Sequence, residues 1–326
     1  MPAGIAIISR CKPRAGLAAM ALAILVASSC ASVADRDATR LRQTAALIQE
    51  VKSFGRTLGI EPTEALSRTT REGPALSMLW LWMQREGTLA LNGPLDIRTA
   101  IGYSAERERV RVEQVYRVDG YSVYYRQGSE FADSRSVATA GFAEESVARR
   151  VTVILHEDLH GDVNFALPWE IEEAIVTPLG ALAAIEWFRW KGDEKSLQRA
   201  IASLADERQT SRDLISLVTR AQKMFAAEPI ETAKQQILAM LGEYAAYQKR
   251  FIRQLRGQHA ATALEAKLSH DLAYYRYFDT IAALAELAPD LKTLIADLKA
   301  IPSKSDHAAV EELLRKLKAR YSTALH

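Results

Sequence analysis

The stretch HEDLH at residues 156–160 holds the residue types that could do chemistry. Two histidines four positions apart lie on the same face of a helix, with Cβ atoms about 5–6 Å apart. Their imidazole nitrogens could bind one cation, with bonds of about 2.0–2.1 Å for zinc. Glu157, next to the first histidine, could take a proton from a metal-bound water. The pattern therefore predicts a zinc hydrolase site built on His156, Glu157 and His160.

A catalytic zinc site also needs a third protein ligand and one open position for water. The stretch LPWEIEEAIVTPLG, which comes after the histidines, supplies several glutamates. If Pro168 opens a helix there, Glu173 and Thr177 lie on one face of it. We predict Glu173 as the third metal ligand and Thr177 as a hydrogen-bonding neighbour of the ligands. Glu170 or Glu172 could hold the amine of a peptide substrate, which would make the protein an aminopeptidase.

Two acidic residues depart from the pattern of zinc-protease helices, whose middle and flanking positions are usually uncharged. Asp158 lies inside the motif and Asp162 comes just after it. These residues favour an alternative, in which the chain is a catalytically impaired, peptidase-like envelope lipoprotein that acts as a binding or assembly factor. A hydrolase of esters or non-peptide amides is a third hypothesis.

Other polar residues have weaker claims on the site. The remaining histidines lie in polar or terminal contexts, and we expect them to face solvent or cap helices: His259, His270, His307 and His326. The run YYRY, which begins at Tyr274, is typical of core packing on a helix. Because a tyrosine hydroxyl near a zinc site can stabilise an oxyanion, Tyr274 and Tyr275 are nevertheless candidate catalytic residues.

The elements that would position these residues come after an N-terminal targeting segment. Residues 1–29 carry a positive patch and the apolar run 15–27, which is shorter than the about 20 apolar residues of a transmembrane helix. The stretch VASSC is similar to a bacterial lipobox, so we predict a lipoprotein signal peptide with lipid on Cys30. An ordinary cleaved signal is the alternative. Cys11 is the only other cysteine, so the mature chain would hold no disulfide.

Composition places the mature chain among ordinary globular proteins. Of the 326 residues, 48% are hydrophobic and 25% are charged, which argues against disorder. Removal of residues 1–29 takes away three basic residues and leaves 39 basic against 40 acidic ones. This balance gives no electrostatic case for nucleic acid binding, and nothing in the sequence indicates an oligomeric state.

Hydrophobic periodicity predicts a mixed N-terminal half. After a polar tether at 30–38, apolar residues at helical spacing over 39–58 predict a helix that Gly59 closes. The range 75–100 fits either a buried strand or a buried helix. The segments 120–127 and 134–142 are typical of strands. The HEDLH motif then lies near the end of a predicted helix that Gly161 stops.

The C-terminal half is expected to be all helical. Alanine- and leucine-rich segments with helical spacing succeed one another at 168–190, 194–226, 229–256, 260–300 and 307–322. The predicted fold class is therefore α+β and predominantly helical. We expect one catalytic domain over 39–326, with an α+β part that holds a small sheet (39–165) and a helical part (166–326).

With these residues laid out, the chain resembles a bacterial family of predicted aminopeptidases, many of which are lipoproteins. The family's hallmark is HELAHQ followed by NESFAT, whose glutamate lies thirteen residues after the second histidine. Glu173 lies at that distance from His160, and EEAIVT is similar to NESFAT. The stretch IGYSAERERVRVEQVYRVDGYSVYYRQ resembles the family's GYF-led helix and GYDVYVGG strand, which implies a helix at 104–117. SVATAGF is similar to the family's STLGWF segment.

Departures from the family pattern concern the neighbours of the ligands. HELAH is HEDLH here, Glu172 replaces an asparagine, and Phe142 stands where the family has tryptophan. An asparagine pair of the family falls at Tyr274 and Tyr275. The resemblance implies zinc binding and peptidase activity, and the departures bear on substrate specificity more than on the metal.

We therefore expect a membrane-anchored zinc metallohydrolase that cleaves peptide bonds as an aminopeptidase, by Glu157-assisted attack of zinc-bound water. The segment 136–142, which includes Gly141, could pair with an extended peptide by strand addition. Export and lipid on Cys30 would place the protein in the bacterial cell envelope, on the periplasmic face of a membrane. The expected cofactor is Zn²⁺, and the expected partners are a peptide substrate and the membrane, not nucleic acid.

Overall fold

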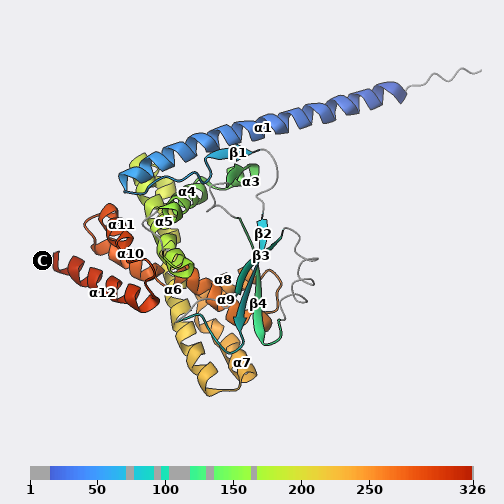
Figure 1. Cartoon of the computed structure of the whole chain (residues 1–326). Coiled ribbons are helices and arrows are strands. Elements are labelled where there is room, and N and C mark those ends of the chain that lie inside the picture. Colours follow the sequence, from blue (N-terminus) through green and yellow to red (C-terminus); the bar gives the residue numbers. More distant parts are fainter. Residues whose placement is uncertain are drawn as a thin grey trace, which may run out of the picture.

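The structure is a computed structural model, and it describes residues 15–70, 77–91, 97–102, 118–129, 136–162 and 167–324. The helix expected at 104–117 and His326 lie outside the described residues. The predicted fold class is confirmed, since a mixed N-terminal half with two small sheets precedes an all-helical C-terminal half (Figure 1).

The elements of the N-terminal half are α1 (Ala15–Thr57), β1 (Arg68–Thr70), β2 (Ser77–Arg85), β3 (Ile97–Gly102), β4 (Tyr121–Ser129), β5 (Val137–Thr139), α3 (Ala140–Glu144) and α4 (Val147–Gly161). The helical half consists of α5 (Trp169–Lys191), α6 (Glu194–Ala227), α7 (Ile230–Met240), the short 3₁₀ helix η1 (Leu241–Glu243), α8 (Ala245–Leu255), α9 (Ala260–Tyr275), α10 (Phe278–Leu287), α11 (Leu291–Lys299) and α12 (His307–Ala324).

Helix α1 includes the helix predicted at 39–58 and ends one residue earlier than expected. Gly59 comes next but one with a φ of 78°, a left-handed conformation that glycine adopts without strain. The segment 30–38, which we expected to be a tether, is helical instead, because no glycine or proline interrupts the chain between Gly16 and Gly55. The first part of α1 projects beyond the other elements (Figure 1). Among the described residues, no helix is both long and apolar enough to cross a membrane.

The strands form two small sheets. In the larger one β2 lies between β3 and β4, antiparallel to both, which resolves the ambiguity of 75–100 in favour of a strand at 77–85 and confirms the strand expected at 120–127. In the smaller one β1 and β5 pair in parallel. The strand expected at 134–142 is shorter, because the Thr139 hydroxyl accepts a hydrogen bond from the backbone N–H of Phe142 at 3.1 Å and begins helix α3.

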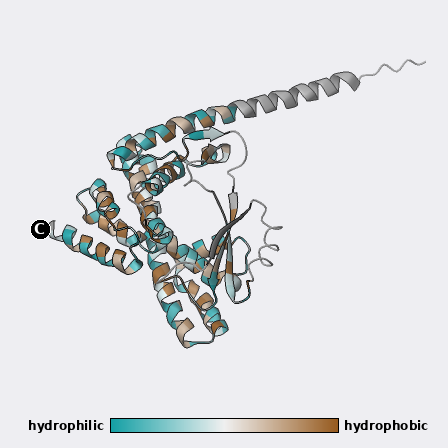
Figure 2. Cartoon of the chain, viewed as in Figure 1, coloured by the Kyte–Doolittle hydropathy of each residue, from teal (hydrophilic) through white to brown (hydrophobic). Residues whose placement is uncertain are grey.

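Two hydrophobic cores meet along helix α5. One joins α1, α4 and α5 with α10 to α12, and its members include Ile48, Ile154 and Ile175. The other packs α6 to α9 against the larger sheet through Trp82 and Tyr124. Outer helices such as α6 and α12 carry hydrophobic and hydrophilic residues side by side (Figure 2), as expected for helices with one buried stripe. Helix α5 is buried over most of its length, so it links the two halves of the molecule.

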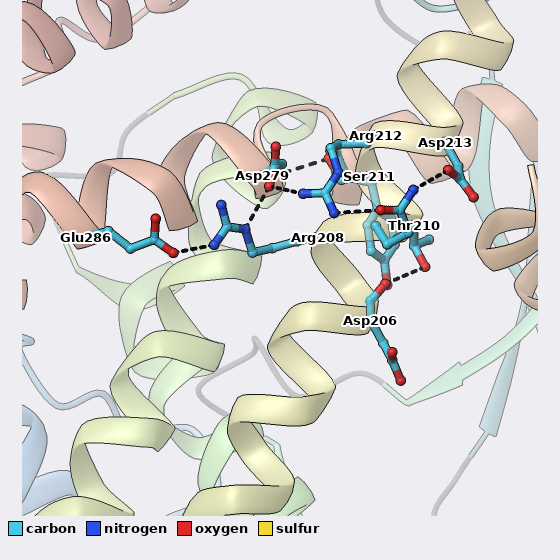
Figure 3. Close-up of polar contacts among 10 residues, drawn as sticks. Asp206, Arg208, Thr210, Ser211, Arg212, Asp213, Asp279 and Glu286 are labelled. Atoms are coloured by element: carbon cyan, nitrogen blue, oxygen red, sulfur yellow. Dashed lines mark hydrogen bonds and ion pairs between the residues drawn. The ribbon is translucent and has the colours of Figure 1, made fainter.

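Helix α6 also holds α10 through a group of ion pairs (Figure 3). Arg208 and Arg212 both contact the carboxylate of Asp279, each at 2.7 Å. Asp279 lies in the first turn of α10, where a negative charge also complements the helix dipole. Because these side chains are partly exposed, we expect each pair to contribute no more than about 1 kcal/mol.

Candidate metal centre

Helices α4 and α5 bring the residues of the HEDLH motif against the glutamates predicted to complete the site. Ser146 caps α4 by accepting a hydrogen bond from the backbone N–H of Arg149 at 3.2 Å. Pro168 precedes the first residue of α5, as predicted. The helices approach closely because residue 180 is a glycine: an added Cβ would lie 3.0 Å from Cβ of His156. Gly180 is a site determinant that the sequence pattern did not single out.

The three predicted metal ligands come together. The Nε2 atoms of His156 and His160 lie 3.1 Å apart. Oε2 of Glu173 lies 3.5 Å from the first and 3.4 Å from the second. Bonds of about 2.0–2.1 Å in tetrahedral geometry place zinc ligands about 3.3 Å from one another. The triangle of ligand atoms therefore fits zinc, and Oε2 of Glu173 is buried without a hydrogen-bond partner among the described residues, as a metal-ligating oxygen would be.

The outward nitrogens of both histidines are held by α5. Nδ1 of His160 donates to Oε1 of Glu172 at 2.8 Å, and the His156 side chain hydrogen bonds with the backbone carbonyl of Val176. Such partners fix the tautomer and direct Nε2 toward a metal. Glu172, which we expected to hold a substrate amine, is instead hydrogen bonded to the predicted metal ligand His160. The prediction missed this role because it depends on how α4 and α5 pack, which the sequence spacing does not specify.

Glu157 lies beside the ligands and is available as a base. Its side chain is 9% exposed, and Oε2 makes no hydrogen bond to any described residue. Burial raises the pKa of Glu157 to about 7, against an opposing effect of the nearby His160. A carboxylate with a pKa near neutrality is well matched to accept and return a proton at physiological pH.

The same surroundings shift the other titratable groups apart. Burial, with help from the charge of His160, lowers the pKa of His156 to about 3. Burial opposes protonation of His160 too, but its close contacts with Glu172 and Glu173 outweigh burial and raise the pKa of His160 to about 10. For Glu173, burial is outweighed by the contact with His160, by the charges of both histidines and by that of Arg126, so its pKa is lowered. His156 is therefore neutral at physiological pH, whereas His160 is protonated, and a metal has to displace that proton to bind it.

No protein-family model, curated protein or solved structure matches the chain. The resemblance to the predicted aminopeptidases therefore stays a prediction, and the function of the chain has to be inferred from the geometry of the site.

The two acidic residues that depart from the zinc-protease pattern point away from the ligands. Asp158 is 1% exposed and pairs with Lys52 of α1. Its Oδ1 also accepts hydrogen bonds from the backbone N–H and the hydroxyl of Thr63, at 3.0 and 2.9 Å. Asp162 is 2% exposed and pairs with Lys299 of α11. These charges hold α4 in the fold, and the sequence could not show it because the two lysines lie far away along the chain.

Gly161 is required by the same contact. It is the last residue of α4, as predicted, and its backbone is not left-handed. Glycine is needed here because an added Cβ would lie 1.9 Å from Cγ2 of Thr63. A side chain at this position would displace the loop that carries Thr63, and with it the hydrogen bonds to Asp158.

The remaining candidate residues fall into two groups. Thr177 lies on α5 one turn after Glu173, and its buried hydroxyl makes no hydrogen bond within the described part of the chain, so it stays a candidate neighbour of the ligands. Glu170 lines a small cavity with Ser269 and Arg276. Gly141 lies in α3 rather than on a strand, so strand addition along 136–142 could use only Val137–Thr139.

The tyrosine pair and His270 belong to a second polar cluster beside α9. Tyr275 is 3% exposed and its hydroxyl donates to Glu207, which leaves it no hydroxyl proton for an oxyanion. The ring of Tyr274 lies 6.1 Å from that of Trp169, the first residue of α5. His270 is 2% exposed, so the expectation that it faces solvent was wrong. His259 does precede α9 as an exposed N-cap residue.

Proposed function

We propose that the chain is a zinc metallohydrolase that cleaves peptide bonds. The observation that carries the proposal is the triangle of His156 Nε2, His160 Nε2 and Glu173 Oε2, whose sides of 3.1 to 3.5 Å suit three of four tetrahedral positions. Its position beside a buried, unpartnered Glu157 supports a catalytic rather than a structural site, since structural zinc sites have four protein ligands and no adjacent base.

The roles of the residues depend on their surroundings. Zinc bound by the two histidines and Glu173 would polarise the substrate carbonyl and lower the pKa of a bound water. Glu157 would take the proton of the attacking water and return it to the leaving amine, a role that fits its buried carboxylate beside the ligands. Glu172 orients the ring of His160 and would keep its Nε2 directed at a bound cation.

The aminopeptidase form of the prediction has less support than peptide hydrolysis itself. It relied on Glu170 or Glu172 to bind a substrate amine. Glu172 is hydrogen bonded to His160, and Glu170 lines a cavity toward α9. Neither carboxylate is therefore free to bind the N-terminal amine of a substrate at the metal site. We propose a peptidase without assigning it as an exopeptidase or an endopeptidase.

The non-enzymatic alternative, a binding or assembly factor of the cell envelope, was motivated by the charges in HEDLH and by the altered neighbours of the ligands. The pairing of Asp158 with Lys52 accounts for one of these charges without any loss of the ligands or of Glu157. The charge of Asp158 is therefore no reason to prefer the alternative, which depends on the altered neighbours alone. The third hypothesis, an ester or amide hydrolase, uses the same site and differs in substrate.

We further propose that the protein is exported and anchored in the cell envelope by lipid on Cys30. The basic patch, apolar run and VASSC stretch support this proposal. In a bacterial host, Cys30→Ala should move the protein from the membrane fraction to the soluble fraction. A variant that remains fully in the membrane fraction would contradict lipid anchoring and would leave the hydrolase proposal untouched.

Glu157→Gln separates the hydrolase from a binding protein. The purified chain, loaded with zinc, is assayed with fluorogenic peptides, esters and acyl amides, and its metal content is measured in parallel. We expect the variant to keep its zinc and to lose hydrolysis by about 10²–10⁴-fold, the usual contribution of a general acid–base group. Glu145→Gln, which changes an exposed glutamate near the start of α4, is the matched control. Full activity in the Glu157 variant would contradict the proposed mechanism.

A further inference from the structure

A cluster centred on Arg126 lies between β4 and α9. Arg126 extends from β4, and its Nη1 donates to Nε2 of His270 at 3.0 Å. Its guanidinium lies 5.1 Å from the centre of the Tyr274 ring, and the Tyr274 hydroxyl is also hydrogen bonded to it. The side chain is partly buried but not closed off from solvent. Its neighbours are therefore an imidazole and a phenol rather than a carboxylate.

A negative charge that acts on Arg126, the carboxylate of Asp271, already has partners of its own. Asp271 is 1% exposed, pairs with Lys267, and accepts a hydrogen bond from the Tyr247 hydroxyl at 2.8 Å. His270 lies between Asp271 and Arg126: its Nδ1 donates to Oδ1 of Asp271 at 2.8 Å. Burial lowers the pKa of His270 to about 3, so the imidazole between Asp271 and Arg126 is neutral.

Among the described residues, Arg126 is left as the uncompensated charge of this cluster. Arg250 pairs with Glu207 at 3.4 Å, and Lys267 pairs with Asp271. Within the described part of the chain, no carboxylate lies within 4.0 Å of a nitrogen of Arg126. A partly buried cation without a counter-ion is a favourable place for an anionic ligand, because the ligand supplies the missing charge. A guanidinium is the side chain best suited to bind a carboxylate through parallel hydrogen bonds.

The cluster faces the metal site through α5. The ring of Tyr274, which lies over the guanidinium of Arg126, packs edge-on against Trp169 at 6.1 Å. Trp169 lies one helical turn before Glu173, on the same face of α5. The rings of Tyr274 and Trp169 therefore connect this cation to the face of α5 that carries Glu173, and a substrate that extends from the metal ligands along these rings would reach it.

We propose that Arg126 binds a carboxylate group of the substrate, so that the enzyme prefers peptides with a negative charge next to the scissile bond. The inference rests on the proposed function and names its substrate class. Two groups could supply the charge: the free C-terminal carboxylate of a peptide, or an aspartate or glutamate side chain. Two successive hydrogen bonds, from His270 to Asp271 and from Arg126 to His270, fix the guanidinium in place, as a preorganised binding group requires.

The test compares matched peptides on the full zinc-loaded chain. One pair differs only in a free or amidated C-terminus, and the other differs only in glutamate or glutamine beside the cleaved bond. We expect kcat/KM to be at least about tenfold higher for the charged member of one pair, since a hydrogen bond to a charged group is worth roughly 1.5–3 kcal/mol. The pair that shows the preference identifies the source of the carboxylate. Equal rates within both pairs would overturn the inference.

Variants show whether Arg126 is responsible. Arg126→Gln should reduce the ratio between the charged and neutral members of the pair to near one. Arg149→Gln removes an exposed arginine whose charge also acts on Glu157, and it should keep the ratio. Retention of the preference in Arg126→Gln, or its loss in Arg149→Gln alone, would contradict the assignment. If Arg126→Gln does not fold, the comparison of matched peptides on the unaltered chain still decides the preference.

Binding measurements keep this inference separate from the proposed function. The Glu157→Gln variant, loaded with zinc, is titrated by calorimetry with the same matched peptides. Tighter binding of the charged peptide without hydrolysis by the unaltered chain would support the role of Arg126 and sink the hydrolase proposal. Hydrolysis with no difference in binding or rate within the pairs would do the reverse.

Discussion

Helix α4 and its C-cap residue carry two pairs of side chains at the same four-residue spacing, and the two pairs have different surroundings. His156 and His160 face α5, whereas Asp158 and Asp162 face the opposite side, toward α1 and α11. Each aspartate has a lysine partner. On the histidine side, Oε2 of Glu173 has only the two imidazoles as counter-groups, at 3.4 and 3.5 Å, and Oε2 of Glu157 is buried without a hydrogen-bond partner in the described residues. Oδ2 of Asp158 is unpaired as well, but Oδ1 of that carboxylate is paired with Lys52 and Thr63.

This difference separates groups that stabilise the fold from groups that await a ligand. Buried polar atoms in native proteins are almost always paired, so an unpaired set at ligand distances needs an explanation, and a bound cation supplies one. The two aspartates already have lysine counter-ions and need no cation. The comparison also explains how a charged residue can lie inside an HExxH motif without disturbing the metal ligands. Substitutions on either side of α4 can break or sharpen it, and the change with the greatest effect concerns the aspartate side.

Lys52→Met should lower the free energy of unfolding by about 3–5 kcal/mol, because it leaves Asp158 as a buried charge without its partner. Arg40→Met is the matched control. It removes an exposed pair with Glu144 and should change the free energy of unfolding by less than about 1 kcal/mol. Urea denaturation of both variants measures the difference. Equal effects would mean that the Asp158 side of α4 does not hold the fold together.

Glu172→Ala should weaken zinc binding by about 10–100-fold, because His160 loses the partner that orients its ring. Its effect on unfolding should be smaller than that of Lys52→Met. Glu170 lies two positions away and lines the cavity with Ser269 and Arg276 instead of contacting a histidine of the metal site. Glu170→Ala should therefore leave the zinc affinity unchanged. Competition with a chromogenic chelator gives both affinities. If Glu170 matters more than Glu172, the roles assigned to these two glutamates are wrong.

Zinc binding at pH 8 should release about one proton. The raised pKa of His160, about 10, means that its ring is still protonated at pH 8, and a metal can bind only the neutral form. His156, with a pKa of about 3, is already neutral and releases none. The affinity should therefore rise about tenfold between pH 7.5 and pH 8.5. Calorimetry in buffers of different ionisation enthalpy counts the protons, and a value of zero would show that His160 is neutral before zinc binds.

The sequence predicted the groups whose spacing along one or two helices decides their position. His156, His160, Glu173 and the start of α5 at Pro168 all depend on helical periodicity, and all lie where expected. The fold class came from the same kind of pattern. Each of these depends on contacts within one element or between consecutive ones.

Groups that depend on distant packing were not predicted. Lys52 lies 106 residues from Asp158, and nothing near either residue indicates the pair. Gly180 is needed only because His156 approaches it from another helix. His270 was expected at the surface, since its own segment is polar, yet α9 is covered by β4, α5 and α6 and the ring is buried. The capping hydroxyl of Thr139, which shortens β5, competes with strand propensity in a way that composition alone does not settle.

The metal content of the purified chain beside a Glu173→Ala variant, with both proteins prepared without chelators, tests the metal centre most directly. The triangle of ligand atoms predicts close to one zinc per chain in the unaltered protein and a strong loss in the variant, while circular dichroism shows the same helical content in both. A folded chain that binds no zinc, or a variant that keeps all of it, would contradict the assignment of His156, His160 and Glu173 as a metal centre.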